Sequence, residues 1–187
     1  MDISDLVAHV AVTGGHGPTQ LREAMTAARE REVARIAAAP VSATRLGADC
    51  LDMCVHAHDL GAALDEPIEL NDHLPAATEA SRLLLRFAPQ LLVTALPGQD
   101  ATLRVTVRGG SQLERTIVVR DGRLQGSPGG PAHGPGLEPA ETIEVDPAAL
   151  VLLLSGRADP GALRHAGTLA WTGAHAETFV HRARLPG

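Results

Sequence analysis

The chain has 187 residues, of which 44% are hydrophobic and 20% charged, so it is long enough to bury a core of its own. Its net charge of -6 and its aromatic content of 2% leave little material for phosphate contacts or base stacking, which argues against nucleic acid as a partner. The sequence has no apolar run of the roughly 20 residues that a membrane span needs and no basic leader segment. We therefore expect a cytoplasmic protein.

The first 40 residues are predicted to form two helices. Between residues 2 and 12, apolar side chains recur at helical spacing, and Thr13–Gly17 interrupts the pattern. A second amphipathic helix follows Pro18, and its arginine- and glutamate-rich face is interpreted as solvated. His9 lies on the first of these helices.

A third helix is predicted from near Ser42, and it contains the densest cluster of reactive side chains in the chain. Both cysteines, three aspartates and two histidines lie between Asp49 and Asp59. The spacing of Cys50 and Cys54 suits reduced thiols, most simply small buried side chains, better than a disulfide. The expected apolar stripe of this helix consists of Leu46, Cys50, Met53, Ala57, Leu60 and Leu64.

A fourth helix is predicted to open at Asp72 and Pro75 and to end near Pro97-Gly98. Pro89 within it predicts a kink or a break. The apolar side chains expected to be strongly buried are Leu83, Leu84, Leu85, Phe87, Leu91 and Leu92.

The hydrophobic period changes to two from Thr102 onward, which predicts strands. Gly109-Gly110 and Asp121-Gly122 are turn signals between the first three strands, and residues 126–139 have the composition of a loop. The remaining predicted elements are a strand at 142–145, a helix after Asp146-Pro147, a short helix at 160–165, a strand at 169–172 and a helix at 174–183. We therefore predict an α+β protein, with a helical bundle in residues 1–97 and a small antiparallel sheet flanked by helices in residues 98–187.

Asp52 and His56 are four residues apart, so a helix places their side chains on the same face. Two side chains do not make a metal site, but His9 on a neighbouring helix supplies the third ligand of a site with an open position. Two imidazoles and one carboxylate suit zinc or another divalent transition metal. Asp5, four residues before His9, is a candidate to hold that imidazole in one tautomer. His58 should point away from His56.

Other candidate residues have simpler interpretations. His16 and His58 are competing candidates for ligation, and His133 lies in the predicted loop. Ser155-Gly156-Arg157 is interpreted as a helix stop rather than as part of a catalytic triad.

Three stretches resemble the mycothiol-dependent maleylpyruvate isomerase family of actinobacteria. The run Ile3–Val10 is similar to the helix that carries a histidine ligand in this family, and the run Asp52–Leu60 is similar to its helix with a carboxylate and a histidine four residues apart. Residues 146–157 and 167–173 resemble the sterol-carrier-protein-like domain that follows a DinB-like helical bundle in this family. The resemblance covers most of the chain.

The resemblance implies metal ligands at His9, Asp52 and His56, a divalent metal that is most simply zinc, and mycothiol as co-substrate. A thiol bound to a metal loses its proton readily and becomes a nucleophile. The expected activity is isomerisation of a small electrophilic substrate or transfer of the thiol to it. The catalytic residues themselves are not assigned by the resemblance.

The sequence departs from the family at three places. Asp52 stands where the family has glutamate, and its side chain is one methylene shorter. His58 stands where the family commonly has tryptophan. The chain begins at what corresponds to the second helix of the family, so a wall of the bundle is either missing or supplied by a second subunit in a homodimer. The alternative interpretation is a non-catalytic module that binds a small molecule or a partner and carries a vestigial metal site.

Overall fold

The structure is a computed structural model that describes residues 27, 30, 31, 34, 42–65, 70, 74–109, 113–125 and 141–185. The chain forms two compact units, Met1–Ser42 and Ala43–Gly187. In the first unit, Glu30 and Arg31 are helical and exposed, as predicted for a solvated charged face. The helix predicted for residues 2–12 lies outside the described residues.

Two long helices open the second unit: α3 spans Ala43–Leu64 and α4 spans Leu74–Ala95. Pro89 lies inside α4 without ending it, so of the predicted kink or break, the break does not occur. The leucines predicted to be buried in α4 are buried, but Phe87 is 47% exposed. Hydrophobicity alone placed Phe87 in the core, whereas its position on the helix turns it outward.

Five strands follow, and they form one sheet in the order β3-β2-β1-β4-β5. Their bounds are Ala101–Val107 for β1, Leu113–Arg120 for β2, Arg123–Leu124 for β3, Glu141–Val145 for β4 and Leu169–Thr172 for β5. Asp121 and Gly122 join β2 to β3 with φ angles of 52° and 68°, the left-handed conformation that a tight hairpin turn requires. The predicted hairpin is therefore confirmed.

The prediction of an antiparallel sheet is wrong at the centre, because β1 and β4 pair in parallel. Leu103 is in register with Glu141, and Val107 with Val145. A parallel pair needs a crossover connection, and here β2, β3 and residues 125–140 connect the two strands. The fold is thus α+β with a mixed sheet.

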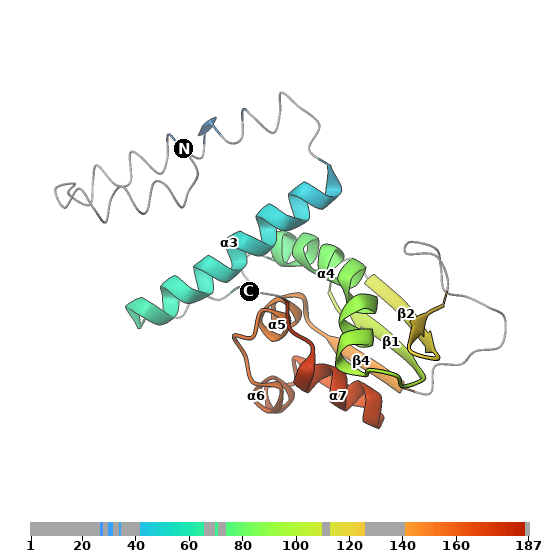
Figure 1. The fold of residues 1–187 in the computed structure, drawn as a ribbon. Coiled ribbons are helices and arrows are strands. Elements are labelled where there is room, and N and C mark those ends of the chain that lie inside the picture. The colour runs from blue at the N-terminus through green and yellow to red at the C-terminus, as the bar shows by residue number, and fades with distance from the viewer. Residues whose placement is uncertain are drawn as a thin grey trace. The chain divides into compact units, whose positions relative to one another are not determined.

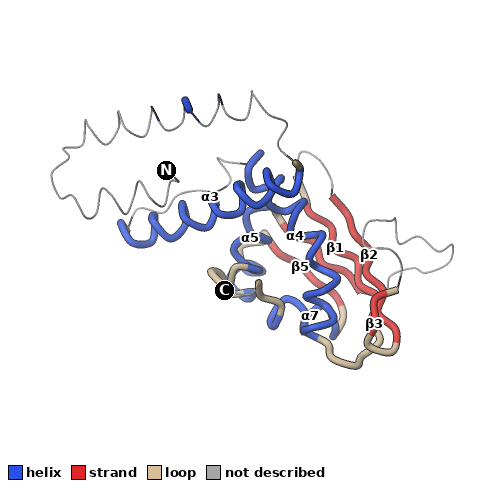
Figure 2. Tube along the Cα trace, turned by 45° about the horizontal axis from the view of Figure 1, so that its top comes forward, coloured by secondary structure: helices blue, strands red, loops and turns tan. Residues whose placement is uncertain are grey.

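Helices cover one face of this sheet (Figures 1 and 2). They include α4, α5 (Pro147–Leu154) and α7 (Ala174–Arg182), with α6 (Pro160–His165) beside β5. The core between helices and sheet includes Leu84, Leu92, Leu103, Val105, Ile117, Ile143, Leu150, Leu154, Leu169 and Phe179. Within the described ranges, no helix has the length and hydropathy needed to cross a membrane.

On the opposite face of the sheet, β1 carries polar side chains. Alternate residues of β1, namely Thr102, Arg104 and Thr106, are only half-buried, and they are in register with Val118, Thr116 and Glu114 of β2. This alternation of apolar and polar side chains is what allows one face of a sheet to meet water.

Candidate functional site

Helix α3 packs on α4 through small residues. Gly47, Cys54 and Gly61 are its buried residues, and they recur every seven positions, so they form one line along the helix. The helices approach so closely at Gly47 that an added Cβ would lie 2.8 Å from Leu83 Cβ and 3.2 Å from the Glu79 carbonyl oxygen. This contact fixes which face of α3 is turned away from α4.

Asp52 and His56 lie on the exposed part of α3. Asp52 Oδ1 is 3.3 Å from His56 Nε2, and the two side chains are 68% and 62% exposed. Two ligands that each lie about 2.0–2.1 Å from a tetrahedral zinc ion are about 3.3 Å apart. One carboxylate oxygen and one imidazole nitrogen therefore stand at a spacing that fits two ligands of a divalent transition metal.

The other two aspartates of α3 have arginine partners. Asp49 forms an ion pair with Arg45, at 2.9 Å from Oδ1 to Nε. Asp59 accepts two hydrogen bonds of 2.7 Å from Arg157. The hydrogen bond from Arg157 and, after it, the positive charge of Arg157 lower the pKa of Asp59. Asp52 is thus the aspartate of this helix that is paired with a histidine.

The two cysteines have packing roles. The side chain of Cys54 is 1% exposed, and burial, together with the nearby Cys50, raises the pKa of its thiol to about 11. Burial and the charges of Glu79 and Asp49 also raise the pKa of Cys50. Neither cysteine is in a disulfide. The prediction of reduced, structural thiols therefore holds, and neither is suited to be a nucleophile at neutral pH.

The three predicted metal ligands are only partly described. The structure brings Asp52 and His56 together, but His9 lies outside the described residues, as do His16 and His133. Among the residues that the structure does describe, no three histidines, cysteines or acids are grouped so that they could hold a metal ion. His58 is half-buried. The three-ligand site stays a prediction.

No local pattern in the sequence indicates the partner of Asp59. Arg157 follows α5 at the predicted helix stop, where Gly156 has a φ of 75°. The amide of Gly156 donates to the carbonyl of Leu153, and that of Arg157 to the carbonyl of Leu152, which is the Schellman pattern of helix ends. The Ser-Gly-Arg signal located this turn correctly. It carried no information on a contact with a residue 98 positions earlier.

The sequence pattern also does not indicate a second histidine with a carboxylate partner. His175 Nδ1 lies 2.8 Å from Glu141 Oε1, and the amide of Ala176 donates to Glu141 Oε2 at 2.8 Å. The Glu141 side chain is 15% exposed and meets the first turn of α7. Both carboxylate oxygens of Glu141 bind the first turn of α7. Glu141 therefore connects β4 to α7.

No protein-family model and no curated protein matches the chain. Among solved structures, the solution structure of the sterol carrier protein domain 2 of Helicoverpa armigera is similar, with 17% identity, a TM-score of 0.35, and coverage of 56% of this chain and 82% of that one. A conserved hypothetical protein from Thermus thermophilus, described as possibly sterol carrier protein, is similar with 17% identity, a TM-score of 0.33, and coverage of 56% and 90%. Membership of the maleylpyruvate isomerase family, with its DinB-like bundle, stays a prediction.

Proposed function

We propose that the protein is a metal-dependent, thiol-using isomerase or thiol transferase that acts on a small electrophile. His9, Asp52 and His56 are the proposed metal ligands. The observation that supports this best is the 3.3 Å separation of Asp52 Oδ1 and His56 Nε2 on an exposed helix face, which is the separation of two ligands around one tetrahedral ion. The sequence resemblance to the mycothiol-dependent family supports mycothiol as the thiol co-substrate.

The residues of α3 have separate tasks in this proposal. Asp52 supplies a carboxylate oxygen, and His56 supplies an imidazole nitrogen. A bound divalent ion would lower the pKa of a thiol that occupies its open position. Cys50 and Cys54 do not compete as nucleophiles, because burial raises the pKa of both thiols. The proposal therefore assigns the reacting thiol to a co-substrate.

The metal content of protein purified without metal additives tests the proposal. We expect about one zinc ion per chain in the wild type and a loss of most of it in His56→Ala and Asp52→Ala. His58→Ala is the matched control, because this neighbouring histidine is not a proposed ligand. Wild-type protein without stoichiometric metal would contradict the proposal, and so would equal metal content in the wild type and in His56→Ala.

The choice of thiol is tested separately. Zinc-loaded wild-type protein should bind mycothiol in isothermal titration calorimetry, and His56→Ala should not. Glutathione is the control thiol, with a similar sulfhydryl group on a different scaffold. Equal binding of both thiols would be compatible with the metal site, but it would contradict mycothiol as the specific co-substrate.

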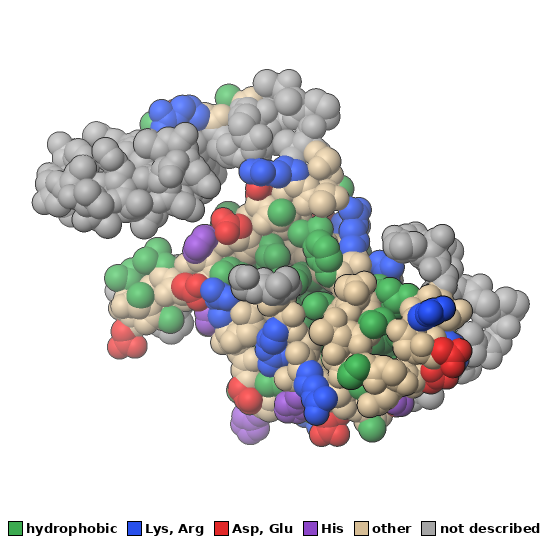
Figure 3. All heavy atoms as spheres, in the orientation of Figure 1, with side chains coloured by type: hydrophobic (Ala, Val, Ile, Leu, Met, Phe, Trp, Pro, Cys, Tyr) green, Lys and Arg blue, Asp and Glu red, His purple; other side chains and the backbone are tan. Residues whose placement is uncertain are grey.

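The second candidate function is a non-catalytic module that binds a partner or a small molecule. It is favoured by three large apolar side chains that α3 exposes: Met53 at 48%, Leu60 at 55% and Leu64 at 60%. They lie within about 40° of one another around the helix and form an apolar stripe beside Asp52 and His56. Figure 3 shows apolar and charged side chains adjoining along α3.

Light scattering combined with metal content distinguishes this module from the enzyme. If the stripe associates with a second copy of the chain, Leu60→Glu should shift the molecular mass from that of a dimer to that of a monomer, and metal content should be negligible in both proteins. Asp65→Glu, at an exposed position near the end of the helix, is the control. A monomeric wild type that binds zinc would favour the enzyme.

A further inference from the structure

Helix α3 is held on the rest of the second unit by small side chains. The structure describes all of α3, and the residues that this helix buries are Gly47, Cys54 and Gly61. Its larger apolar side chains are half-buried or exposed, and Met53 and Leu60 are 48% and 55% exposed. The stabilisation from burial scales with the apolar area that is removed from water. The packing of α3 therefore contributes little for a helix of 22 residues.

The helices beneath α3 are packed much more tightly. Helix α4 buries five leucines, and α5 buries seven of its eight residues. In Figures 1 and 2, α3 lies on the side of α4 and α5 that faces away from the sheet. Beyond the end of α3, Leu70 is 4% exposed and belongs to the core. The core between helices and sheet can therefore persist while α3 is detached.

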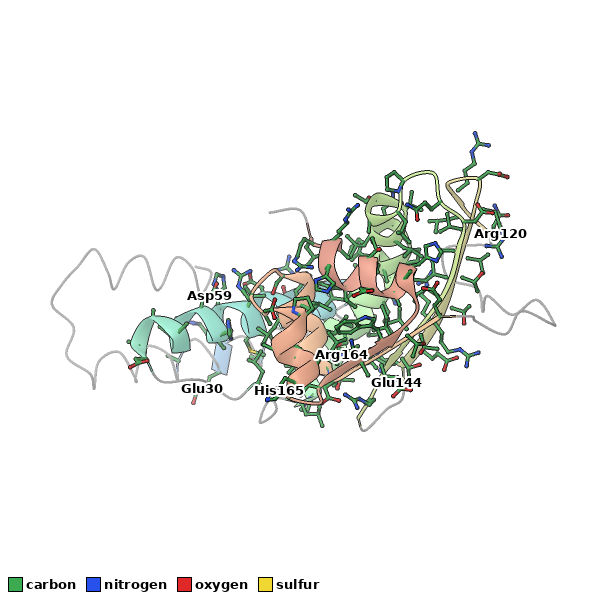
Figure 4. All side chains as sticks on the ribbon, turned by 90° about the horizontal axis from the view of Figure 1, so that it is seen from below. Glu30, Asp59, Arg120, Glu144, Arg164 and His165 are labelled. Atoms are coloured by element: carbon green, nitrogen blue, oxygen red, sulfur yellow. The ribbon has the colours of Figure 1, made fainter. Side chains whose placement is uncertain are left out.

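A bidentate ion pair joins α3 to the end of α5. Arg157 donates from Nε to Asp59 Oδ1 and from Nη2 to Oδ2, both at 2.7 Å, so the planar guanidinium matches the carboxylate along two parallel bonds. On the α5 side, the amide of Arg157 is bonded to the Leu152 carbonyl, and Nη1 is bonded to the Ser155 carbonyl oxygen at 2.9 Å. Figure 4 labels Asp59 on α3. The arginine is thus fixed to α5 and reaches α3 through Asp59.

We propose that α3 is a lid that opens from α4 and α5 while the sheet stays folded, and that the Asp59–Arg157 pair is the latch that holds it closed. The lid is a property of α3 itself and does not depend on a bound metal. Opening uncovers α5, whose side chains are apolar on every face, and the thiol of Cys54, which is 1% exposed in the closed state. Since the latch is partly exposed to solvent, salt weakens it.

Hydrogen exchange of the backbone amides measures the opening. A detached helix of this length is only marginally stable in water, so the amides of α3 exchange in the open state. We expect them to exchange faster than the amides of β1 and β4. Their exchange rates should also depend only weakly on urea, because opening of the lid exposes less surface than global unfolding does.

Two substitutions distinguish the latch from the core. The Asp59–Arg157 contact is broken in the open state and also in the unfolded state, so Asp59→Asn should speed the exchange of α3 and of β1 by the same factor of about three to five. Ile143 is 1% exposed on β4, in the part that stays folded when the lid opens. Ile143→Val is the control, and it should speed the exchange of β1 and β4 about threefold and leave that of α3 unchanged.

Exchange is followed by mass spectrometry on the full-length wild type and on each variant, where the rate is proportional to the opening equilibrium. Each protein is measured at low salt and at about 1 M salt, where the Debye length is about 3 Å. The difference between Asp59→Asn and the wild type should shrink at high salt. If Asp59→Asn does not fold, Arg157→Met breaks the same contact from the α5 side.

Three results would overturn the inference. If the amides of α3 are as protected and as dependent on urea as those of β1, then α3 opens only when the whole unit unfolds, and there is no lid. The same conclusion follows if Ile143→Val speeds α3 and β1 equally. If Asp59→Asn speeds β1 but leaves α3 unchanged, the ion pair persists in the open state and is not the latch.

Discussion

At the scale of single residues, the two thiols of the chain differ in exposure, because one of them is buried between α3 and α4. Cys54 is 1% exposed, whereas Cys50 is only half-buried on the same helix. A thiol reacts through its thiolate, so burial protects Cys54 in two ways: it excludes the reagent and raises the pKa to about 11. Cys50 keeps partial access.

We predict that a thiol reagent at about pH 8, near the ordinary pKa of a thiol, labels Cys50 slowly and leaves Cys54 unmodified in the folded protein. Cys50→Ala should show no labelling until denaturant is added, and then one equivalent. Mass spectrometry after timed labelling measures both. Rapid labelling of Cys54 in folded Cys50→Ala would show that the contact between α3 and α4 opens readily.

Arg115 compensates for a proline. Pro89 has no N–H group, so it cannot donate to the carbonyl of Leu85 four residues earlier in α4. Arg115 of β2 donates to this carbonyl instead, from Nη1 at 3.2 Å. A charged side chain on the inner side of the sheet thereby satisfies a backbone group that the helix leaves without a donor.

A double-mutant cycle tests this compensation. Arg115→Met should lower the free energy of unfolding by about 1–2 kcal/mol, because it leaves the Leu85 carbonyl without a partner. In the background of Pro89→Ala, which restores the N–H donor, the same substitution should cost less than half as much. Urea unfolding followed by Trp171 fluorescence gives all four values. An equal cost in both backgrounds would mean that Arg115 contributes through packing.

The sequence was sufficient to place Asp52 and His56 on one helix face, because a helix has a fixed period. It was not sufficient to identify the contact between Asp59 and Arg157. That contact depends on how α3 lies against the end of α5, and no local pattern encodes the distance between two residues 98 positions apart.

At the scale of elements, the close approach of α3 to α4 depends on Gly47. Alanine is a better helix former than glycine by about 1 kcal/mol, so propensity alone would favour replacement. The added Cβ, however, would lie 2.8 Å from Leu83 Cβ and 3.2 Å from a backbone oxygen. Relief of this overlap requires the two helices to separate.

We predict that Gly47→Ala destabilises the protein by about 1–2 kcal/mol in spite of the gain in helix propensity, because overpacking costs more than propensity returns. Ala48→Gly, at the exposed neighbouring position, measures the propensity term alone. Thermal unfolding of both variants gives the comparison. Stabilisation by Gly47→Ala would show that α3 can shift on α4 at little cost.

Most elements of the second unit follow from local patterns. The alternation of Leu103, Val105 and Val107 with polar residues predicts β1, and proline before the apolar run 148–154 predicts α5. The parallel pairing of β1 with β4 has no such signal, because a strand has the same period whichever direction its neighbour runs. The exposure of Phe87 has no sequence signal for a related reason: hydrophobicity does not say which face of a helix packs against another element.

At the scale of the whole molecule, Asp59 and Arg157 join the first helix of the second unit, α3, to the turn after α5. Because the hydrogen bond and charge of Arg157 lower the pKa of Asp59, the ionised carboxylate is favoured in the folded state. The pair therefore stabilises the fold above the ordinary carboxyl pKa of about 3.9. This contribution is lost as the pH falls through the lowered pKa.

We predict that Asp59→Asn lowers the free energy of unfolding at neutral pH by no more than about 1 kcal/mol, since the side chains of Asp59 and Arg157 are 45% and 33% exposed and solvent screens the pair. The difference from the wild type should vanish near about pH 2. Urea unfolding at both pH values measures this. A difference that is equally large in acid would assign the effect to packing rather than to charge.

The strand order also constrains how the chain folds. Strands β1, β2 and β3 are consecutive neighbours, but β4 reaches β1 only after a loop closes between Leu103 and Glu141. Closing this loop costs entropy before the new contacts compensate for it, so we expect the β1–β2 hairpin to form before the transition state and β4 to join after it.

Ile117 and Ile143 are buried to nearly the same degree on β2 and β4, and replacing each by valine gives a matched kinetic comparison. Ile117→Val should mainly slow folding, and Ile143→Val should mainly speed unfolding.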